Sequence, residues 1–194
     1  DASQAFGKIK VNFKDLGCDL MTISSHKSGG PVGAAALIAK KEINLRANIL
    51  GGKQELGLRA GTENILAISG FGLAAEISKD KYNATSSLRD YFENEIDGES
   101  IANEALRLPN TSCIRMPNVK NEEQLIKFDL AGISLSSGSA CSSGRIANSH
   151  VLKAMGIKEN IANEIIRVSI GPNTTKQEIN EFIKLWKDIY NHGK

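Results

Sequence analysis

The sequence has no apolar run long enough to cross a membrane, and it carries little net charge. A membrane-spanning helix needs about 18 predominantly apolar residues, whereas the longest weakly polar stretch, 65–77, is interrupted by Ser69, Gly70 and Gly72. The 24 lysines and arginines nearly balance the 22 aspartates and glutamates, and they form no basic cluster. These patterns exclude a membrane span in this sequence and the electrostatic footprint of a nucleic-acid-binding protein.

Cysteine is also scarce. Cys18, Cys113 and Cys141 are the three cysteines, and no two of them form a Cys-x-x-Cys pair. This small, odd number argues against a disulfide framework, so we expect a cytoplasmic protein in a reducing compartment. A Gly-x-x-x-x-Gly-Lys-[Ser/Thr] sequence is absent as well, which excludes a P-loop nucleotide site.

The remaining composition, with 41% hydrophobic and 24% charged residues, is that of a globular protein of one domain or two small ones. The apolar patterns predict strands over 8–13, 18–24, 34–39, 111–116, 133–136 and 165–170. They predict helices over 63–79, 84–96, 122–130 and 149–155, and a last helix after the capping box Thr175-x-x-Glu178. Interleaved strands and helices indicate an α/β or α+β class, and the polar stretch 78–84 is the best candidate domain boundary.

Lys27 follows the strand predicted over 18–24 and precedes a Gly29-Gly30-Pro31 turn. Taken alone, a lysine at such a position is more often a solvated loop charge than a reactive amine. A Schiff base with pyridoxal 5′-phosphate would need a rigid mount, a lowered pKa and a carboxylate for the ring nitrogen. Asp1 could supply that carboxylate and Gln4 could donate to the ring hydroxyl oxygen, although simple solvation near the terminus also explains both.

Two further residues stand out from their surroundings. Cys141 lies in the small polar run 136–144, where nothing can bury a thiol, so a functional role is favoured over a structural one. Arg167 interrupts the apolar strand predicted over 165–170, as either a carboxylate-binding residue or an edge-strand arginine that faces solvent. Thr62, after Arg59 and Gly61, either caps the following helix or contacts a phosphate.

Together these segments resemble the cysteine desulfurases, which are class V aminotransferase-like enzymes of pyridoxal-phosphate fold type I. The matching segments occur in the family's order along nearly the whole chain: Asp1-Ala2-Ser3-Gln4-Ala5-x-Gly7-Lys8, Ser25-His26-Lys27-x-x-Gly30-Pro31-x-Gly33, Arg59-Ala60-Gly61-Thr62-Glu63-Asn64, Leu108-Pro109-Asn110-Thr111-Ser112, Ser136-Ser137-Gly138-Ser139-Ala140-Cys141-Ser142-Ser143 and Ile166-Arg167-Val168-Ser169-Ile170-Gly171. The long cysteine loop is similar to that of the iron–sulfur-cluster and nitrogen-fixation branch.

The resemblance implies that Lys27 holds pyridoxal 5′-phosphate covalently and moves the substrate's Cα proton. Asp1 would keep the ring nitrogen protonated, and Gln4 would bond the ring hydroxyl. Ser24 and His26 correspond to positions that hold the cofactor phosphate.

The resemblance also implies roles for three residues farther along the chain. Thr62 would reach a phosphate across a homodimer interface, and Arg167 would bind the carboxylate of the substrate L-cysteine. Cys141 would attack the substrate sulfur, which leaves a persulfide on Cys141 and releases L-alanine. The sulfur would then pass to an iron–sulfur scaffold or another acceptor protein.

The implied fold class is α/β. Residues 1–80 would form the C-terminal part of the large mixed-sheet domain, and residues 81–194 the small C-terminal domain with the cysteine loop. The chain opens at Asp1, and the family's upstream phosphate loop and ring-stacking histidine have no counterpart here. We therefore expect a C-terminal half that binds the cofactor poorly or not at all by itself.

The sequence departs from the family's pattern at Val32, Lys53 and Leu56, where a lysine, a glycine and an arginine are usual. Two alternatives stay open. The first is another enzyme of this fold, a selenocysteine lyase or a class V aminotransferase, although an aminotransferase has no use for Cys141. The second is a catalytically inactive fragment or interaction module.

Overall fold

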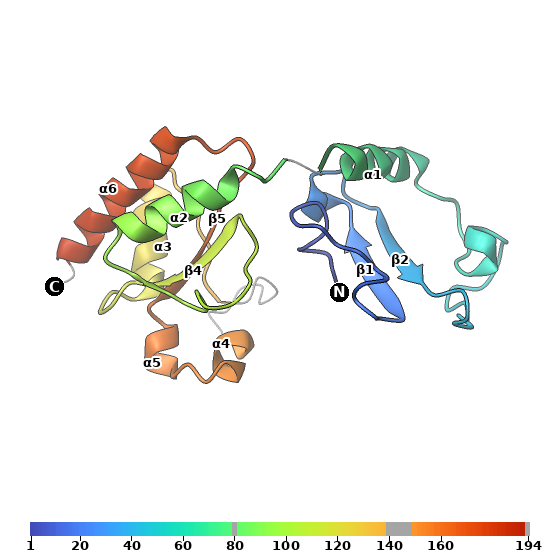
Figure 1. Cartoon of the computed structure of the whole chain (residues 1–194), viewed down its shortest axis with the longest axis horizontal. Helices are drawn as coiled ribbons and strands as arrows, with labels where there is room; N and C mark the ends of the chain where they lie inside the picture. The colour runs from blue at the N-terminus through green and yellow to red at the C-terminus, as the bar shows by residue number, and fades with distance from the viewer. Residues whose placement is uncertain (79–80, 139–148, 193–194) are drawn as a thin grey trace. The chain divides into compact units, whose positions relative to one another are not determined.

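The computed structural model describes residues 1–78, 81–138 and 149–192 of the 194-residue chain. These residues form two units, Asp1–Tyr82 and Asn83–Lys194, and Figure 1 shows the helices and strands of each. Both units combine helices with strands, so the α/β class predicted from the sequence is confirmed. No helix in the described ranges is both long and apolar enough to span a membrane.

The first unit is built on a two-stranded antiparallel sheet of β1 (Leu20–Ser24) and β2 (Ala35–Ala39), at the two places where the apolar runs predict strands. A 3-10 turn, η1 (His26–Ser28), follows β1 and ends at Gly29, whose φ of 88° suits glycine. The two strands are less buried than predicted. Met21 is the one buried residue in them, because each strand pairs only with the other among the described residues.

The strand predicted over 8–13 is wrong. Residues 3–9 form consecutive turns, in which the amides of Lys8 and Ile9 both donate to the carbonyl oxygen of Ala5. The main chain therefore satisfies its hydrogen bonds locally, and the alternating pattern of the sequence has no partner strand to pair with.

Helix α1 (Ile65–Ile77) follows the short turn η2 (Glu55–Gly57). The helix is capped by Asn64, whose side-chain oxygen accepts from the amide of Ala67 at 3.2 Å, and not by Thr62 as the sequence pattern predicts. Its exposed apolar side chains lie on the side of the helix away from the buried Ala67, Phe71 and Ala74: Ile65, Leu66, Ile68, Leu73 and Ile77.

The second unit is a three-stranded antiparallel sheet with helices on both faces (Figure 1). The strand order is β3–β4–β5, with β3 at Glu99–Ser100, β4 at Thr111–Arg115 and β5 at Ile165–Ser169. The helices are α2 (Thr85–Glu95), α3 (Asn121–Leu130), α4 (His150–Ala154), α5 (Glu159–Ala162) and α6 (Lys176–His192). The segment 133–136 is not a strand and contributes only an isolated bridge at Ser136.

One face of this sheet forms the main core with α2, α3 and α6. Ile114 and Ile166 point from the strands into a cluster that holds the rings of Phe92, Phe182 and Trp186. The opposite face carries a smaller apolar cluster, which joins the sheet to α4 and α5. Helix α6 begins at the predicted capping box, in which the Glu178 amide donates to the Thr175 hydroxyl and the Thr175 amide donates to the Glu178 carboxylate.

Candidate functional site

The carboxylate of Asp1 is tied to strand β1. Its Oδ1 atom accepts from the hydroxyl of Thr22 at 3.1 Å and from the amide of Ser3 at 2.8 Å. The next amide, that of Ala2, donates to the carbonyl oxygen of Thr22 at 2.9 Å. Since both donors bind Oδ1, the exposed side chain has its Oδ2 atom available to a cation or a protonated ring nitrogen.

The sequence predicts that the end of a strand holds Lys27 in place. In the structure Lys27 lies instead in the 3-10 turn η1, which follows β1. The neighbours of Lys27 are fixed. Ser25 and Ser28 are buried, and the amide and hydroxyl of Ser28 both donate to the carbonyl oxygen of Ser25. The Lys27 side chain is exposed. A rigid turn therefore presents a solvent-accessible amine five residues after Thr22, the strand position that holds Asp1.

Ser24 and His26 form a polar pair beside this turn. The Ser24 hydroxyl and the Nδ1 atom of His26 lie 3.0 Å apart. Thr62 is exposed two residues before the α1 cap. All three side chains can donate hydrogen bonds to an anionic oxygen, so they are suitable phosphate contacts, although a serine-bonded histidine is also an ordinary surface arrangement.

Lys8 and Gln4 form a contact to which the sequence interpretation assigns no role. The Lys8 ammonium donates to the carbonyl oxygen of Gln4 at 3.0 Å and to its side-chain oxygen at 2.8 Å. Burial lowers the pKa of Lys8, and the charge of Lys27 lowers it further. The four-residue spacing between Gln4 and Lys8 is the feature of the sequence that could have predicted this contact. It is informative only where the chain turns, and the sequence alone predicts a strand over 8–13.

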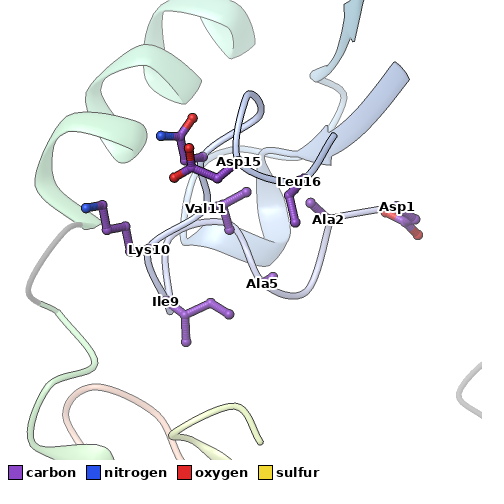
Figure 2. Close-up of a pocket in the computed structure, with 9 residues that line it drawn as sticks. Asp1, Ala2, Ala5, Ile9, Lys10, Val11, Asp15 and Leu16 are labelled. Carbon is purple, nitrogen blue, oxygen red and sulfur yellow. The ribbon is translucent and has the colours of Figure 1, made fainter. Parts of the chain in front are cut away.

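A hollow of about 380 Å³ lies beside Asp1, within the turns of the N-terminal segment (Figure 2). Asp1 borders it on one side, and Lys10 and Asp15 lie on the other. Most of the lining between them is apolar, from Ile9 and Leu16 among others. Of the predicted cofactor residues only Asp1 lines this hollow, so it is separate from the surface around Lys27.

Arg167 lies in β5 of the second unit, opposite Cys113 of β4. Burial raises the pKa of the Cys113 thiol and the positive charge of Arg167 opposes that rise, so the guanidinium lies close to a neutral thiol. On its other side, the main chain of Arg167 pairs with Ser136. Across the described ranges no Asp or Glu forms an ion pair with Arg167.

The structure thus brings Asp1, Gln4 and Lys27 into one unit and places Arg167 in the other. Cys141, the predicted sulfur nucleophile, lies outside the described residues. Among the residues that are described, no three His, Cys, Asp or Glu side chains gather closely enough to hold a metal ion.

The first unit has groups that can bond the aldehyde, the ring nitrogen and the ring hydroxyl of pyridoxal 5′-phosphate. An accessible primary amine on Lys27 can bond the aldehyde, and the free oxygen of the Asp1 carboxylate can accept from the ring nitrogen. The Gln4 side-chain oxygen is occupied by Lys8, which leaves its nitrogen to donate to the ring hydroxyl oxygen. The residues present therefore fit this cofactor.

Comparison with known proteins is consistent with this donor set. Residues 1–182 match the family model described as aminotransferase class-V. The chain is 38% identical to a cysteine desulfurase from Rhodobacter capsulatus over 97% of its own length and 51% of the relative, and 40% identical to the cysteine desulfurase IscS of Dictyoglomus turgidum over 93% and 48%. The chain spans about half the length of the curated relatives it matches.

Solved structures show the same likeness. The X-ray structure of a NifS-like protein from Rickettsia africae is 40% identical, with a TM-score of 0.88 over 98% of this chain and 52% of that one. A second NifS-like protein is 30% identical, with a TM-score of 0.87 over 99% and 52%.

Proposed function

The chain belongs to the class-V aminotransferase family, and from that membership we propose that it carries the lysine, arginine and cysteine of a pyridoxal-phosphate-dependent cysteine desulfurase. The proposed reaction converts L-cysteine to L-alanine and leaves the sulfur as a persulfide on Cys141. The relatives named cysteine desulfurase support this reaction class. Because the chain spans about half of their length, the activity of the whole protein remains a proposal.

The observation that carries the proposal is the hydrogen bond between Thr22 and Asp1. It joins two residues 21 positions apart and holds a carboxylate beside the strand that leads to Lys27. Pyridoxal 5′-phosphate needs an amine to bond its aldehyde and a carboxylate to pair with its ring nitrogen. Lys27 and Asp1 would supply these two groups from one local structure.

Pyridoxal 5′-phosphate, when bound, would supply an electron sink for the bonding electrons at the substrate's Cα. Lys27 would anchor the cofactor and then move the Cα proton with the same amine. Asp1 would hold a proton on the ring nitrogen, because a carboxylate close to a cation favours the charged form of that cation. Ser24, His26 and Thr62 would donate to the phosphate.

Arg167 would bind the substrate carboxylate. Its guanidinium has no internal ion pair in the described ranges, and a planar fork of N–H donors suits a carboxylate. The neighbouring Cys113 does not compete, because its raised pKa keeps the thiol neutral. An uncharged neighbour leaves the full positive charge of Arg167 available to the substrate.

The Cys141 thiolate would attack the sulfur of the bound L-cysteine. A sulfur–sulfur bond forms as the carbon–sulfur bond breaks, and the carbon retains the electron pair and takes up a proton to become the methyl group of L-alanine. The sulfane sulfur stays on Cys141 until an acceptor thiolate removes it. An iron–sulfur scaffold or a comparable sulfur acceptor is the partner that this chemistry needs.

We further propose that the protein acts as a cytoplasmic homodimer. The exposed apolar side chains of α1 support a protein–protein contact, since large apolar patches of this kind mark interaction sites. Thr62, two residues before the cap of that helix, would then lie close to the interface. The absence of a disulfide framework in the sequence supports a reducing compartment.

The test is production of L-alanine and persulfide from L-cysteine by the purified chain with pyridoxal 5′-phosphate, with Cys141→Ala and Cys18→Ala as a matched pair of cysteine variants. We expect Cys141→Ala to abolish sulfur release without changing the absorbance of bound cofactor, and Cys18→Ala to behave like the wild type. Persistent sulfur release by Cys141→Ala would refute the mechanism. A folded chain that takes up no cofactor would instead support the inactive-module alternative.

A further inference from the structure

Lys8 is held by the local turns of the N-terminal segment in a position where it reaches back to Gln4. The amide of Lys8 donates to the carbonyl oxygen of Ala5, which directs the lysine side chain toward the preceding turn. Its ammonium then donates to both oxygens of Gln4, the main-chain oxygen at 3.0 Å and the side-chain Oε1 atom at 2.8 Å. Two acceptors from one residue fix the ammonium and the glutamine side chain together.

This lysine differs from the ordinary surface lysines of the unit. Lys8 is half-buried, and no Asp or Glu in the described ranges pairs with it. Lys40, by contrast, is exposed and forms an ion pair with Asp19 at 2.7 Å. Burial of a cation with only amide oxygens as partners is unfavourable compared with a solvated ion pair. Its position therefore calls for a role beyond solubility.

Lys8 also lies close to Lys27. Gly7 packs against the turn that carries Lys27, since a Cβ atom added to Gly7 would lie 3.0 Å from the Cβ atom of Ser28. The lowered pKa of Lys8 has the charge of Lys27 as its second cause after burial. The turn that ends in Lys8 therefore packs against the turn that carries Lys27.

The ammonium determines which end of the Gln4 amide is free. An ammonium group has three donors and no acceptor, so only the Oε1 atom can face it. The Nε2 atom is then the end that points away, and it can only donate. A glutamine without such a partner turns either end outward.

We propose that Lys8 is a positioning residue for the cofactor: by holding the Oε1 atom of Gln4, it leaves the Gln4 nitrogen to donate to the ring hydroxyl oxygen and so selects the deprotonated oxygen. This inference rests on the proposed function for the identity of the cofactor. The Lys8–Gln4 part of it does not, because that contact exists in the protein alone.

The first experiment reads out Gln4 without cofactor. The order parameter of the Gln4 side-chain amide is measured by NMR relaxation in the wild type, Lys8→Met, Lys8→Arg and the exposed-lysine control Lys14→Met, and Gln4→Asn assigns the signal. We expect Lys8→Met to lower this order parameter below about 0.6, the range of flexible groups, because the Oε1 atom loses the ammonium that holds it. Lys8→Arg retains the donor cation and should stay close to the wild type, as should Lys14→Met. Equal order parameters in Lys8→Met and the wild type would overturn the inference by themselves.

The second experiment adds pyridoxal 5′-phosphate at one fixed pH and records its binding constant and absorbance. We expect Lys8→Met to weaken cofactor binding about tenfold and to shift the cofactor's absorbance toward the short-wavelength band of the form whose ring hydroxyl oxygen is protonated. Lys8→Arg should keep the wild-type binding constant and the wild-type absorbance. A merely structural role of Lys8 would not move the ratio of the two bands, so an unchanged ratio in Lys8→Met overturns the ring contact. A wild type that binds no cofactor favours the inactive-module alternative over the proposed function and overturns the ring contact in this chain, while the Gln4 order parameters still decide whether Lys8 holds Gln4.

Discussion

The main chain of Arg167 is hydrogen-bonded in both directions to the main chain of Ser136. The Arg167 amide donates to the Ser136 oxygen at 2.6 Å, and the Ser136 amide donates to the Arg167 oxygen at 3.2 Å. Cys113 lies opposite Arg167 on the neighbouring strand β4. The proposed carboxylate-binding residue therefore lies between strand β4 and the isolated bridge at Ser136, and its backbone position does not depend on its side chain.

This arrangement predicts that the Arg167 side chain can be removed with little loss of stability. We expect Arg167→Ala to raise the KM for L-cysteine about 10- to 100-fold, the effect of losing a charge-assisted hydrogen-bonding pair. Steady-state kinetics and urea unfolding together test this expectation. Arg167→Lys should recover only part of the KM, because it lacks the planar fork.

Arg115→Ala is the matched control, since Arg115 lies on the same strand face as Cys113 but forms ion pairs with Glu99 and Glu164. It should lower the free energy of unfolding and leave the KM near the wild-type value. If Arg167→Ala destabilised the protein and left the KM unchanged, Arg167 would be structural.

The second prediction concerns the pair of Glu93 and Arg107. Two hydrogen bonds of 2.8 and 2.9 Å join their side chains, and the Ser112 hydroxyl donates to the same carboxylate, which is 10% exposed. Burial acts to raise the pKa of Glu93, but the hydrogen bonds from Arg107 and Ser112 outweigh it and the pKa is lowered. We expect Glu93→Gln to reduce the free energy of unfolding by about 2–3 kcal/mol near neutral pH.

The same shift predicts how stability depends on pH. A carboxylate whose pKa is lower in the folded state stabilises the fold above its unfolded pKa, and this contribution is lost as the pH falls through the folded value. Urea unfolding of the wild type should therefore show a loss of stability below about pH 4.5, the ordinary value for this group. Glu93→Gln should show a smaller loss over that range, whereas the exposed Glu122→Gln should follow the wild type. Parallel pH curves for Glu93→Gln and the wild type would contradict the prediction.

The third prediction tests the packing of the main core at Gly98. A Cβ atom placed there would lie 2.9 Å from both the Cγ2 atom of Ile114 and the Cζ2 atom of Trp186. Both side chains are fully buried and cannot move aside easily. We expect Gly98→Ala to lower the free energy of unfolding of this unit by about 1–3 kcal/mol.

Gly171→Ala supplies the comparison, because a Cβ atom there meets only the Thr174 hydroxyl at an ordinary 3.6 Å. Thermal or urea unfolding should separate the two variants clearly. Equal stability of both would show that the core accommodates the added methyl group.

Local sequence patterns predict much of the secondary structure correctly. The apolar runs at β1 and β2 and the capping box of α6 depend on residues a few positions apart, so the sequence is sufficient for them. The strands predicted over 8–13 and 133–136 are wrong, because a strand needs a partner and the pattern of one segment cannot show whether one exists. The short β3 and α5 were missed, since neither is long enough to give a periodic signal.

The sequence by itself determined the residue types of the candidate site and, through the order of its segments, the resemblance to cysteine desulfurases. Only the tertiary structure decided how Lys27 is mounted, which oxygen of Asp1 is free, and that Lys8 holds Gln4. It also placed Arg167 between Cys113 and Ser136. The physical reason is that residue type specifies which hydrogen bonds and charges are possible, whereas turns and strand pairing determine which groups come within reach of one another.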